Sequence, residues 1–316
     1  DIEDLLFTNS PFPQLNTKGI VGKIYRETVR TIQGFSQGKP KFSPVTALRK
    51  SILKASENLK SPYFIYCHTD FAHRPYTPPL SIKNMFKKNS IFPFPLNAMF
   101  GFWKEYPKMM QKHYAGKKVI SDEKLKELNY LYDECLEHID SEIEKLFNTL
   151  KRKEALRNTV FLITADHGEM LGEREKIGHN YCFLDELLNV PLIIHHPKIE
   201  PERMEEQIET KEISNIISNL SKQKFENFYK KSKFAFGQWR ATRKSYEKIK
   251  KINPSMYTSA EYIRTKKLKY VDFDNGLTDL YSLKDNQKKI DRPDLEKLMR
   301  KELKAKRKRH GSVLRQ

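Results

Sequence analysis

Hydrophobic positions along the chain recur in two patterns, one typical of amphipathic helices and one of buried strands. Apolar residues spaced three and four apart predict a helix over residues 46–59 and a longer one from Ser121, its expected N-cap, to about Lys153. A further helix is expected over about residues 22–33. Continuous apolar runs of strand length occupy residues 63–68, 159–165 and 190–195. Because strand, long helix and strand follow one another, the pattern predicts a βαβ unit and a parallel sheet covered on both faces.

Beyond residue 200 the apolar segments become shorter. Helices are expected over residues 213–220 and from about Pro293 onward. Between them, short antiparallel strands are expected at residues 234–239, 262–273 and 277–283. The sequence Asp-Asn-Gly at 274–276 provides hairpin-turn residues between the last two. We therefore divide the chain into residues 1–200, part of an α/β domain, and residues 201–316, a smaller subdomain with a basic terminal helix.

Length and charge narrow the classes of protein that fit. The 316 residues suffice for two ordinary domains or one large α/β domain with an appendage. The 59 basic and 40 acidic residues give a formal net charge of +19. The lysines are spread along the whole chain, residues 301–310 being the one dense block, and no nucleic-acid-binding motif accompanies them. Nucleic acid is therefore not favoured as a partner, and no apolar run approaches the roughly 18–20 residues of a membrane span.

The cysteines and the start of the chain bear on the cellular compartment. Cys67, Cys135 and Cys182 are an odd number without a CxxC pair, which favours a reducing, cytoplasmic location over a disulfide framework. The chain begins at Asp1 with neither Met nor a signal-peptide pattern. We therefore expect it to be a fragment or a processed product, which leaves a signal peptide open.

Charged and imidazole side chains follow the predicted strands. The first apolar run is followed by His68, Asp70 and His73, and the second by Asp166 and His167, with His179 a dozen residues later. A carboxylate beside a neutral imidazole is a ligand pair that divalent metals accept. The simpler alternatives are a helix N-cap for Asp166, a buried loop histidine for His73 and a surface residue for His179.

Several of these segments together resemble the sulfatase family. The stretch TADHGEMLGEREKIGHNYCFLDELLNVPLIIHHP at residues 164–197 is similar to the family's C-terminal motif, and PYFIYCHTDFAHRPYTPP at 62–79 to its histidine-containing loop. Residues 132–143 resemble the helix between them. IRTKKLKYVDF and LTDLYSLKDN, at residues 263–286, resemble the closing strands. The matches occur in the family's order from about residue 60 to residue 290.

This resemblance implies a fold and a set of roles. The fold is an alkaline-phosphatase-like three-layer α/β/α core, incomplete in this chain, with a smaller C-terminal antiparallel sheet-and-helix subdomain. Asp166 and His167 match the metal-binding pair, His73 a candidate general acid on the leaving-group side, and His179 the residue that holds a non-bridging oxygen. Calcium is the metal that the family implies, whereas His167 favours manganese or zinc, because imidazole is a poor calcium ligand.

One departure from the family concerns the nucleophile. The motif Cys/Ser-x-Pro-x-Arg and a pair of aspartates on a first strand are not found in these 316 residues. We expect them upstream of Asp1, and we expect this chain alone to be inactive. The resemblance implies metal-dependent hydrolysis of a sulfate ester, carried by a glycan or a small alcohol. The alternatives are a phosphodiester or phosphonate hydrolase, a phospho-headgroup transferase, or a non-catalytic binding protein that retains the fold.

Overall fold

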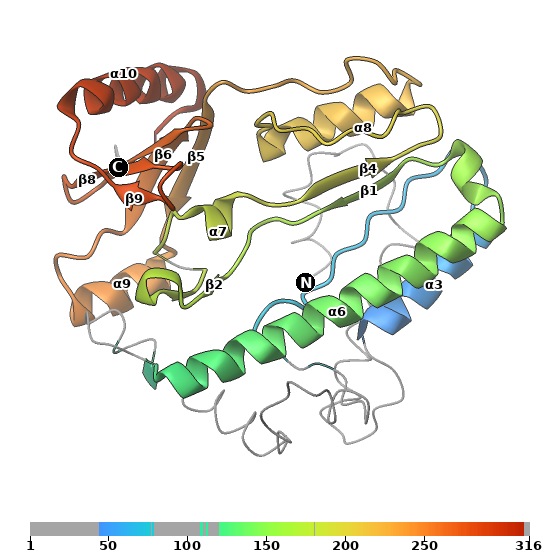
Figure 1. Cartoon of the computed structure of the whole chain (residues 1–316), viewed down its shortest axis with the longest axis horizontal. Coiled ribbons are helices and arrows are strands. Elements are labelled where there is room, and N and C mark those ends of the chain that lie inside the picture. Colours follow the sequence, from blue (N-terminus) through green and yellow to red (C-terminus); the bar gives the residue numbers. More distant parts are fainter. Residues whose placement is uncertain are drawn as a thin grey trace. The chain divides into compact units, whose positions relative to one another are not determined.

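The structure is a computed structural model that describes residues 44–76, 78, 108–109, 112, 120–179 and 181–312. The helix expected over residues 22–33 lies outside these residues. The chain forms two compact units, and Figure 1 labels helices and strands of both. The first unit comprises residues 1–106 and 120–159, and the second residues 107–119 and 160–316. The domain boundary placed near residue 200 stays a prediction.

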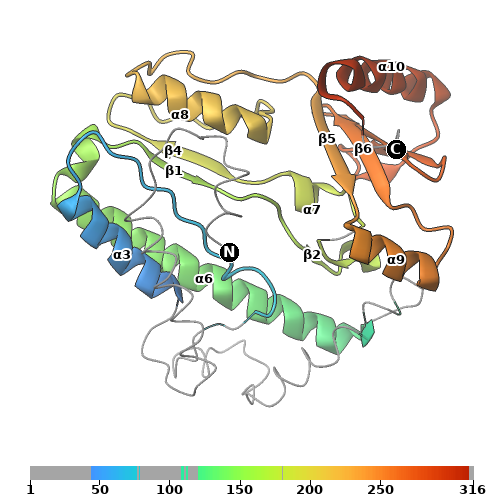
Figure 2. The ribbon, with the colours of Figure 1, turned by 180° about the vertical axis from the view of Figure 1, so that it is seen from behind.

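Two helices build the described part of the first unit, as the apolar spacing predicted. They are α3 (Pro44–Asn58) and α6 (Asp122–Arg152), which lie side by side (Figure 2). The side chain of Ser121 accepts a hydrogen bond from the Lys124 N–H, so the predicted N-cap is confirmed. No described helix is long and apolar enough to span a membrane.

A buried carboxylate fastens these two helices to each other. Glu142 of α6 is 4% exposed, and its oxygens accept from Arg49 Nε of α3 at 2.8 Å and from Lys145 Nζ at 2.6 Å. Burial alone raises the pKa of this carboxyl, but the hydrogen bonds from Arg49 and Lys145 outweigh it and lower the pKa to about 2.

The strand expected at residues 63–68 is not observed. These residues run without strand pairing, and Tyr66 is 58% exposed, so the prediction of a buried strand there was wrong for the described structure. The apolar run indicates an extended segment correctly, but a strand also needs a partner whose backbone completes the hydrogen bonds. Ile65 and Cys67 do pack against Leu48 and Ala55 of α3.

The second unit begins with the two other predicted strands, β1 (Phe161–Thr164) and β4 (Leu192–His195). They pair antiparallel, with Phe161 opposite His195 and Thr164 opposite Leu192, so the predicted parallel pairing is wrong here. Apolar runs fix where strands lie but not their direction, and no long crossover helix separates these two along the chain. The connection contains short elements instead: β2 (Met170–Leu171), β3 (Ile177–Gly178) and α7 (Asp185–Leu188).

Helix α8 (Ile213–Ser221) covers the β1–β4 pair. Its Ile216 and Leu220 pack with Phe228 against Leu162 and Ile194 of the two strands. The predicted helix over residues 213–220 is thus confirmed. Single turns of 3₁₀ helix occur at Ala155–Asn158, Glu173–Glu175 and Thr210–Glu212.

A five-stranded antiparallel sheet forms the C-terminal part, and it includes the three predicted segments, of which residues 262–273 are divided between two strands. Its strands pair in chain order: β5 (Ala235–Arg240), β6 (Ser259–Arg264), β7 (Leu268–Phe273), β8 (Thr278–Ser282) and β9 (Lys288–Lys289). Helix α9 (Arg243–Ile252) joins β5 to β6. Gly276, with φ of +83°, lies in the predicted turn between β7 and β8, a conformation that favours glycine.

The two faces of this sheet are covered by different elements. On one face Ile263 and Tyr270 pack against Met299 and Leu303 of α10 (Pro293–His310). On the other face Ala260, Val271 and Phe273 pack against Phe183, which lies just before α7. Strand residues alternate between the faces, so each helix meets its own set of side chains. The sheet therefore holds the α7 segment in place.

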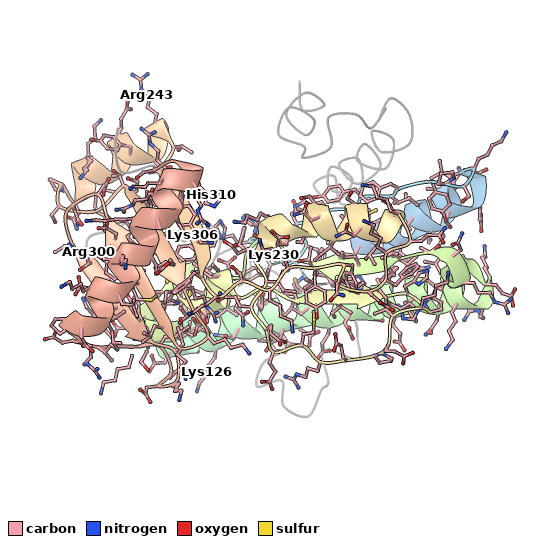
Figure 3. All side chains as sticks on the ribbon, turned by 90° about the horizontal axis from the view of Figure 1, so that it is seen from above. Lys126, Lys230, Arg243, Arg300, Lys306 and His310 are labelled. Carbon is pink, nitrogen blue, oxygen red and sulfur yellow. The ribbon has the colours of Figure 1, made fainter. Side chains whose placement is uncertain are left out.

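The densest basic block of the sequence lies in α10, along which Figure 3 shows Arg300, Lys306 and His310. Part of this charge is paired. Arg300 Nη2 lies 3.2 Å from a Glu296 oxygen, and Lys306 Nζ lies 3.6 Å from a Glu209 oxygen. The pair of Arg300 with Glu296 is largely exposed and therefore adds little to stability, whereas Lys306 and Glu209 are mostly buried.

Candidate functional site

The turn after β1 carries the first candidate residues and depends on a glycine. Gly168 donates its N–H to the Leu187 carbonyl of α7 at 2.9 Å. A Cβ on Gly168 would lie 1.9 Å from the Glu186 carbonyl oxygen, which no side chain could tolerate without moving the backbone. Close approach of two backbones thus requires glycine at this position and fixes the turn against α7.

Asp166 and His167 present two donor atoms on this turn. His167 Nδ1 donates to the Gly168 carbonyl at 2.8 Å, so its Nε2 carries the lone pair. That Nε2 lies 3.9 Å from Asp166 Oδ2, and the His167 N–H donates to Asp166 Oδ1 at 3.0 Å. The side chain of Asp166 is 67% exposed and that of His167 41%. The pair offers a carboxylate oxygen and an imidazole nitrogen on an accessible surface, which suits two ligands of one divalent metal.

His179 joins the pair through the β2–β3 hairpin. Met170 pairs with Gly178, so the neighbouring residues Glu169 and His179 meet at the end of the hairpin. His179 Nδ1 lies 3.2 Å and 3.3 Å from the two Glu169 carboxylate oxygens, and that carboxylate is 4% exposed. The rings of His167 and His179 are 4.5 Å apart between centroids. The hairpin therefore brings His179 next to Asp166 and His167.

His73 lies in the first unit, on a loop fastened to α6. The ring centroids of Phe71 and His138 are 5.4 Å apart, and those of Tyr76 and Tyr132 are 5.2 Å apart in an edge-to-face arrangement. Between these anchors His73 is exposed, with Nδ1 2.7 Å from the Arg74 carbonyl oxygen. The loop therefore supports an accessible imidazole, and the alternative of a buried histidine is wrong. Its predicted proximity to Asp166 stays a prediction, because the two residues belong to different units.

The surroundings of Asp166 and His179 exclude the simpler alternatives for these two residues. No helix begins after Asp166, since the next described residues run into β2, so Asp166 is not a helix N-cap. His179 is only 18% exposed on its side chain and faces Glu169, so it is not a plain surface residue. The second unit thus brings Asp166, His167 and His179 close together, and the roles assigned to them stay predictions.

The candidate residues do not form a complete set of metal ligands among the described residues, and neither Cys67 nor Cys182 is an activated thiol. They hold no group of three or more His, Cys, Asp or Glu side chains that could bind a metal, so Asp166 and His167 would need further ligands. Burial raises the pKa of the Cys67 thiol to about 11 and also raises that of Cys182. Neither is a thiolate at neutral pH, so neither is suited to act as a nucleophile.

Two features of the site were not predicted from the sequence. Glu169 stands in the motif that carried the resemblance, but its contact with His179 depends on the hairpin register. The second feature is a charged network of Asp185, Arg264 and Lys269 behind α7. Its two cations lie in the segment that resembled the family's closing strands. The signal in the sequence is the alternation along β7, which places Lys269 on the same face as the apolar Val271 and Phe273.

Comparison with known proteins agrees with this arrangement. The profile of the sulfatase family matches residues 6–223. An uncharacterized sulfatase, YidJ, of Escherichia coli is 33% identical over 75 residues, 24% of this chain and 15% of that protein. The choline-sulfatase of Rhizobium meliloti is 32% identical over 82 residues, 26% of this chain and 16% of that protein.

Among solved structures, the phosphonate monoester hydrolase of Agrobacterium radiobacter is similar, with a TM-score of 0.65 and 17% identity. The similarity covers 85% of this chain and 61% of that hydrolase, so the chain spans less than two thirds of that protein's length. The shared fold is the alkaline-phosphatase-like fold, with a small antiparallel sheet in the C-terminal part. The predicted fold class is therefore confirmed.

Proposed function

Because the chain belongs to the sulfatase family, we propose that it forms the metal- and anion-binding part of a hydrolase that cleaves sulfate esters. The observation that supports this most is the grouping of Asp166, His167 and His179 at the end of β1. One carboxylate and two imidazoles on one accessible surface suit an anionic ester held beside a divalent metal ion.

Each residue has a distinct part in this proposal. Asp166 and His167 hold the metal ion, together with ligands beyond the described residues. When bound, the ion supplies positive charge that stabilises the transferring sulfuryl group. His179 binds a non-bridging oxygen of the ester, and Glu169 keeps its ring in place through Nδ1. In this proposal, Nε2 of His179 faces the substrate.

His73 is proposed as the general acid. As an incoming oxygen nucleophile, ultimately water, bonds to sulfur, the ester S–O bond breaks and its electron pair stays on the departing oxygen, which takes a proton from the imidazole. The loop of His73 is held at Phe71 and Tyr76 while the imidazole itself is exposed, which suits a residue that must reach the leaving group. This role requires that the two units bring His73 to the Asp166 site.

Hydrolysis of a phosphonate or phosphate diester is the second candidate. The similarity in fold to a phosphonate monoester hydrolase favours it, and so does His167, since imidazole prefers manganese or zinc to calcium. A phospho-headgroup transferase or a non-catalytic binding protein would use the same Asp166 and His179 contacts. Substrate choice between sulfur and phosphorus centres separates these candidates.

Kinetics of the complete protein test the proposal. Nitrophenyl sulfate, alkyl sulfates and nitrophenyl phosphonates would be compared for the wild type, Asp166→Ala and His73→Ala. We expect Asp166→Ala to lose bound metal and activity together. For alkyl sulfates, His73→Ala should lower the rate by about 10²–10⁴-fold while keeping the metal, and the loss should shrink for nitrophenyl sulfate, whose leaving group needs little protonation.

A matched control is His310→Ala, which removes an exposed histidine of α10 outside the site and should leave rates unchanged. Equal losses in His73→Ala for good and poor leaving groups would make His73 a binding residue instead. Faster turnover of phosphonates than of sulfates would favour the second candidate.

A further inference from the structure

Two cations lie side by side on one face of the C-terminal sheet. Arg264 of β6 and Lys269 of β7 are cross-strand partners, and the side chain of Lys269 is 0% exposed. Like charges directly opposite each other destabilise a sheet, and buried ones do so strongly. The pair therefore needs an anion close to both residues.

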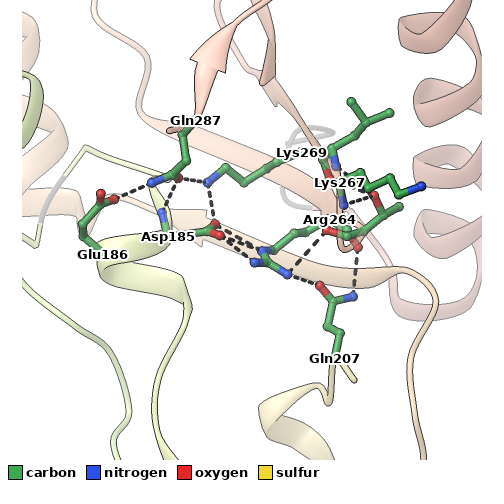
Figure 4. Close-up of polar contacts among 9 residues, drawn as sticks. Asp185, Glu186, Gln207, Arg264, Lys267, Lys269 and Gln287 are labelled. Carbon is green, nitrogen blue, oxygen red and sulfur yellow. Dashed lines mark hydrogen bonds and ion pairs between the residues drawn. The ribbon is translucent and has the colours of Figure 1, made fainter. Parts of the chain in front are cut away.

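Asp185, the first residue of α7, is that anion (Figure 4). Its Oδ2 accepts from Arg264 Nη2 at 2.6 Å, and its Oδ1 accepts from Lys269 Nζ at 2.8 Å. Burial raises the pKa of this carboxyl, but the hydrogen bonds from Arg264 and the charge of Lys269 outweigh it and lower the pKa. Asp185 is therefore ionised and bridges the two strands.

Gln287 extends the bridge along α7. Its Oε1 accepts from Lys269 Nζ at 2.7 Å and from the Asp185 N–H at 2.5 Å, while its Nε2 donates to Glu186 at 2.8 Å (Figure 4). The side chain thus contacts the first two residues of α7 and the buried lysine at once. The four-residue helix is held at its start by the sheet, although a helix this short has little stability of its own.

The other side of α7 contacts the turn that carries the site. The Leu187 carbonyl accepts from the Gly168 N–H, and the Glu186 carbonyl fills the space where a Cβ of Gly168 would lie. Leu184 and Leu187 also pack against Met170 of β2. Helix α7 therefore lies between the charged bridge and the Asp166–His167 turn, in contact with both.

We propose that Arg264 and Lys269 are positioning residues that act through Asp185 and α7 to hold the Asp166–His167 turn in place. The link between this role and catalysis rests on the proposed function of that turn. The mechanical part of the role does not depend on it. A substitution at Lys269 should therefore loosen the Gly168 contact while the sheet stays folded.

The opposite face of the same two strands provides a matched control. Glu261 and Asp272 are cross-strand partners of like charge, and Arg307 of α10 bridges them, with Nη2 2.7 Å from Asp272. The Glu261 side chain is 0% exposed, so this bridge is comparably buried. Because α10 carries no candidate site residue, breaking this bridge should not affect Gly168.

Selective isotope labelling can report on both faces in one spectrum. Carbonyl-¹³C histidine combined with ¹⁵N glycine selects His-Gly pairs, and this sequence contains two, His167-Gly168 and His310-Gly311. The Gly168 N–H donates to α7, and the Gly311 N–H donates to the Arg307 carbonyl of α10. Chemical shift and hydrogen exchange of these two amides would be measured in Lys269→Met, Asp185→Asn and Arg307→Met.

We expect Lys269→Met and Asp185→Asn to speed exchange at Gly168 by about tenfold or more and to leave Gly311 unchanged. Arg307→Met should speed hydrogen exchange at Gly311 and leave Gly168 unchanged. Equal changes at both glycines in every variant, or an unchanged Gly168 in Lys269→Met, would overturn the proposal. If Lys269→Met and Asp185→Asn do not fold, the same exchange measurement on Arg264→Lys tests the proposal. This variant keeps the charge but loses the paired contact with Asp185, so exchange at Gly168 should again be faster while Gly311 is unchanged.

Titration of the wild type with Zn²⁺ separates this inference from the proposed function. Under the proposed function, Zn²⁺ shifts the Gly168 signal in the wild type and not in Asp166→Ala. An absent Zn²⁺ response together with faster Gly168 exchange in Lys269→Met would leave the positioning role intact and contradict metal binding. The opposite pair of results would contradict only the positioning role.

Discussion

The C-terminal sheet carries one like-charged pair on each face, and the helices that neutralise them differ greatly. On one face α10, with 18 residues, places Arg307 between Glu261 and Asp272 and also buries Met299 and Leu303. On the other face α7, with four residues, places Asp185 between Arg264 and Lys269. The long helix has an apolar face to hold it, whereas the short one depends much more on the charged bridge.

The difference shows how the same electrostatic arrangement can serve two purposes. The α10 bridge adds specificity to a contact that apolar burial already provides. The α7 bridge fixes a short element against which the Asp166–His167 turn rests. A third bridge, Glu142 between Arg49 and Lys145, fastens α3 to α6 in the first unit. Asp185 and Glu142 are thus carboxylates placed between two cations, whereas in the α10 bridge Arg307 is a cation between two carboxylates.

The largest effect is expected when the α7 bridge loses its anion. Asp185→Asn keeps the size of the side chain but leaves Arg264 and a fully buried Lys269 without a counter-charge, which should cost about 3–5 kcal/mol in the free energy of unfolding. Urea denaturation of the complete protein measures this. Arg307→Met is the control, with an expected cost of about 1–3 kcal/mol, because Met299 and Leu303 still hold α10 against the sheet and Gln238 still donates to Glu261. A larger loss in Arg307→Met would contradict the comparison.

The Glu142 bridge should make the folding stability of the protein sensitive to acid. Its pKa is lowered to about 2 from an ordinary 4.5, so its stabilising contribution is fully present above pH 4.5 and is lost as the pH falls towards 2. The shift corresponds to at most about 3 kcal/mol. Thermal unfolding followed between pH 6 and pH 2 should show this loss in the wild type. Glu142→Gln should be less stable at pH 6 and should lose less on acidification, and parallel curves for both proteins would contradict the bridge.

A backbone substitution tests the contact between α7 and the site. Gly168→Ala places a methyl group against the Glu186 carbonyl, and the displaced backbone should cost about 1–3 kcal/mol and weaken Zn²⁺ binding. Gly276→Ala is the control, since it has a φ of +83° but nothing within 4 Å of a Cβ. It should cost about 1 kcal/mol and leave Zn²⁺ binding unchanged. The Zn²⁺ affinity of both variants would be measured by calorimetry. Equal affinities would contradict the view that the contact between the Asp166–His167 turn and α7 supports metal binding.

Periodicity predicted α3, α6, α8 and α10 and most strands of the described residues, because it reflects which side of an element is buried, but α9 was not predicted. It could not give the antiparallel direction of β1 and β4, since strand direction depends on the connection rather than on the run itself. Helix α7, with four residues, is too short to show a helical repeat of apolar residues. The residues Asp166 and His179 were predictable from motifs, but the contact of His179 with Glu169 required the β2–β3 register. The bridge of Asp185 to Lys269 joins residues 84 positions apart and becomes visible only in the folded chain.

In the proposed function, Asp166 and His167 are ligands of one divalent metal ion. Crystals of the complete protein grown with Zn²⁺, with data collected on both sides of the zinc absorption edge, test it directly. We expect an anomalous peak about 2.0–2.2 Å from a carboxylate oxygen of Asp166 and from Nε2 of His167, and no peak there in Asp166→Ala. A fully occupied zinc peak bound elsewhere, with neither residue among its ligands, would contradict the account.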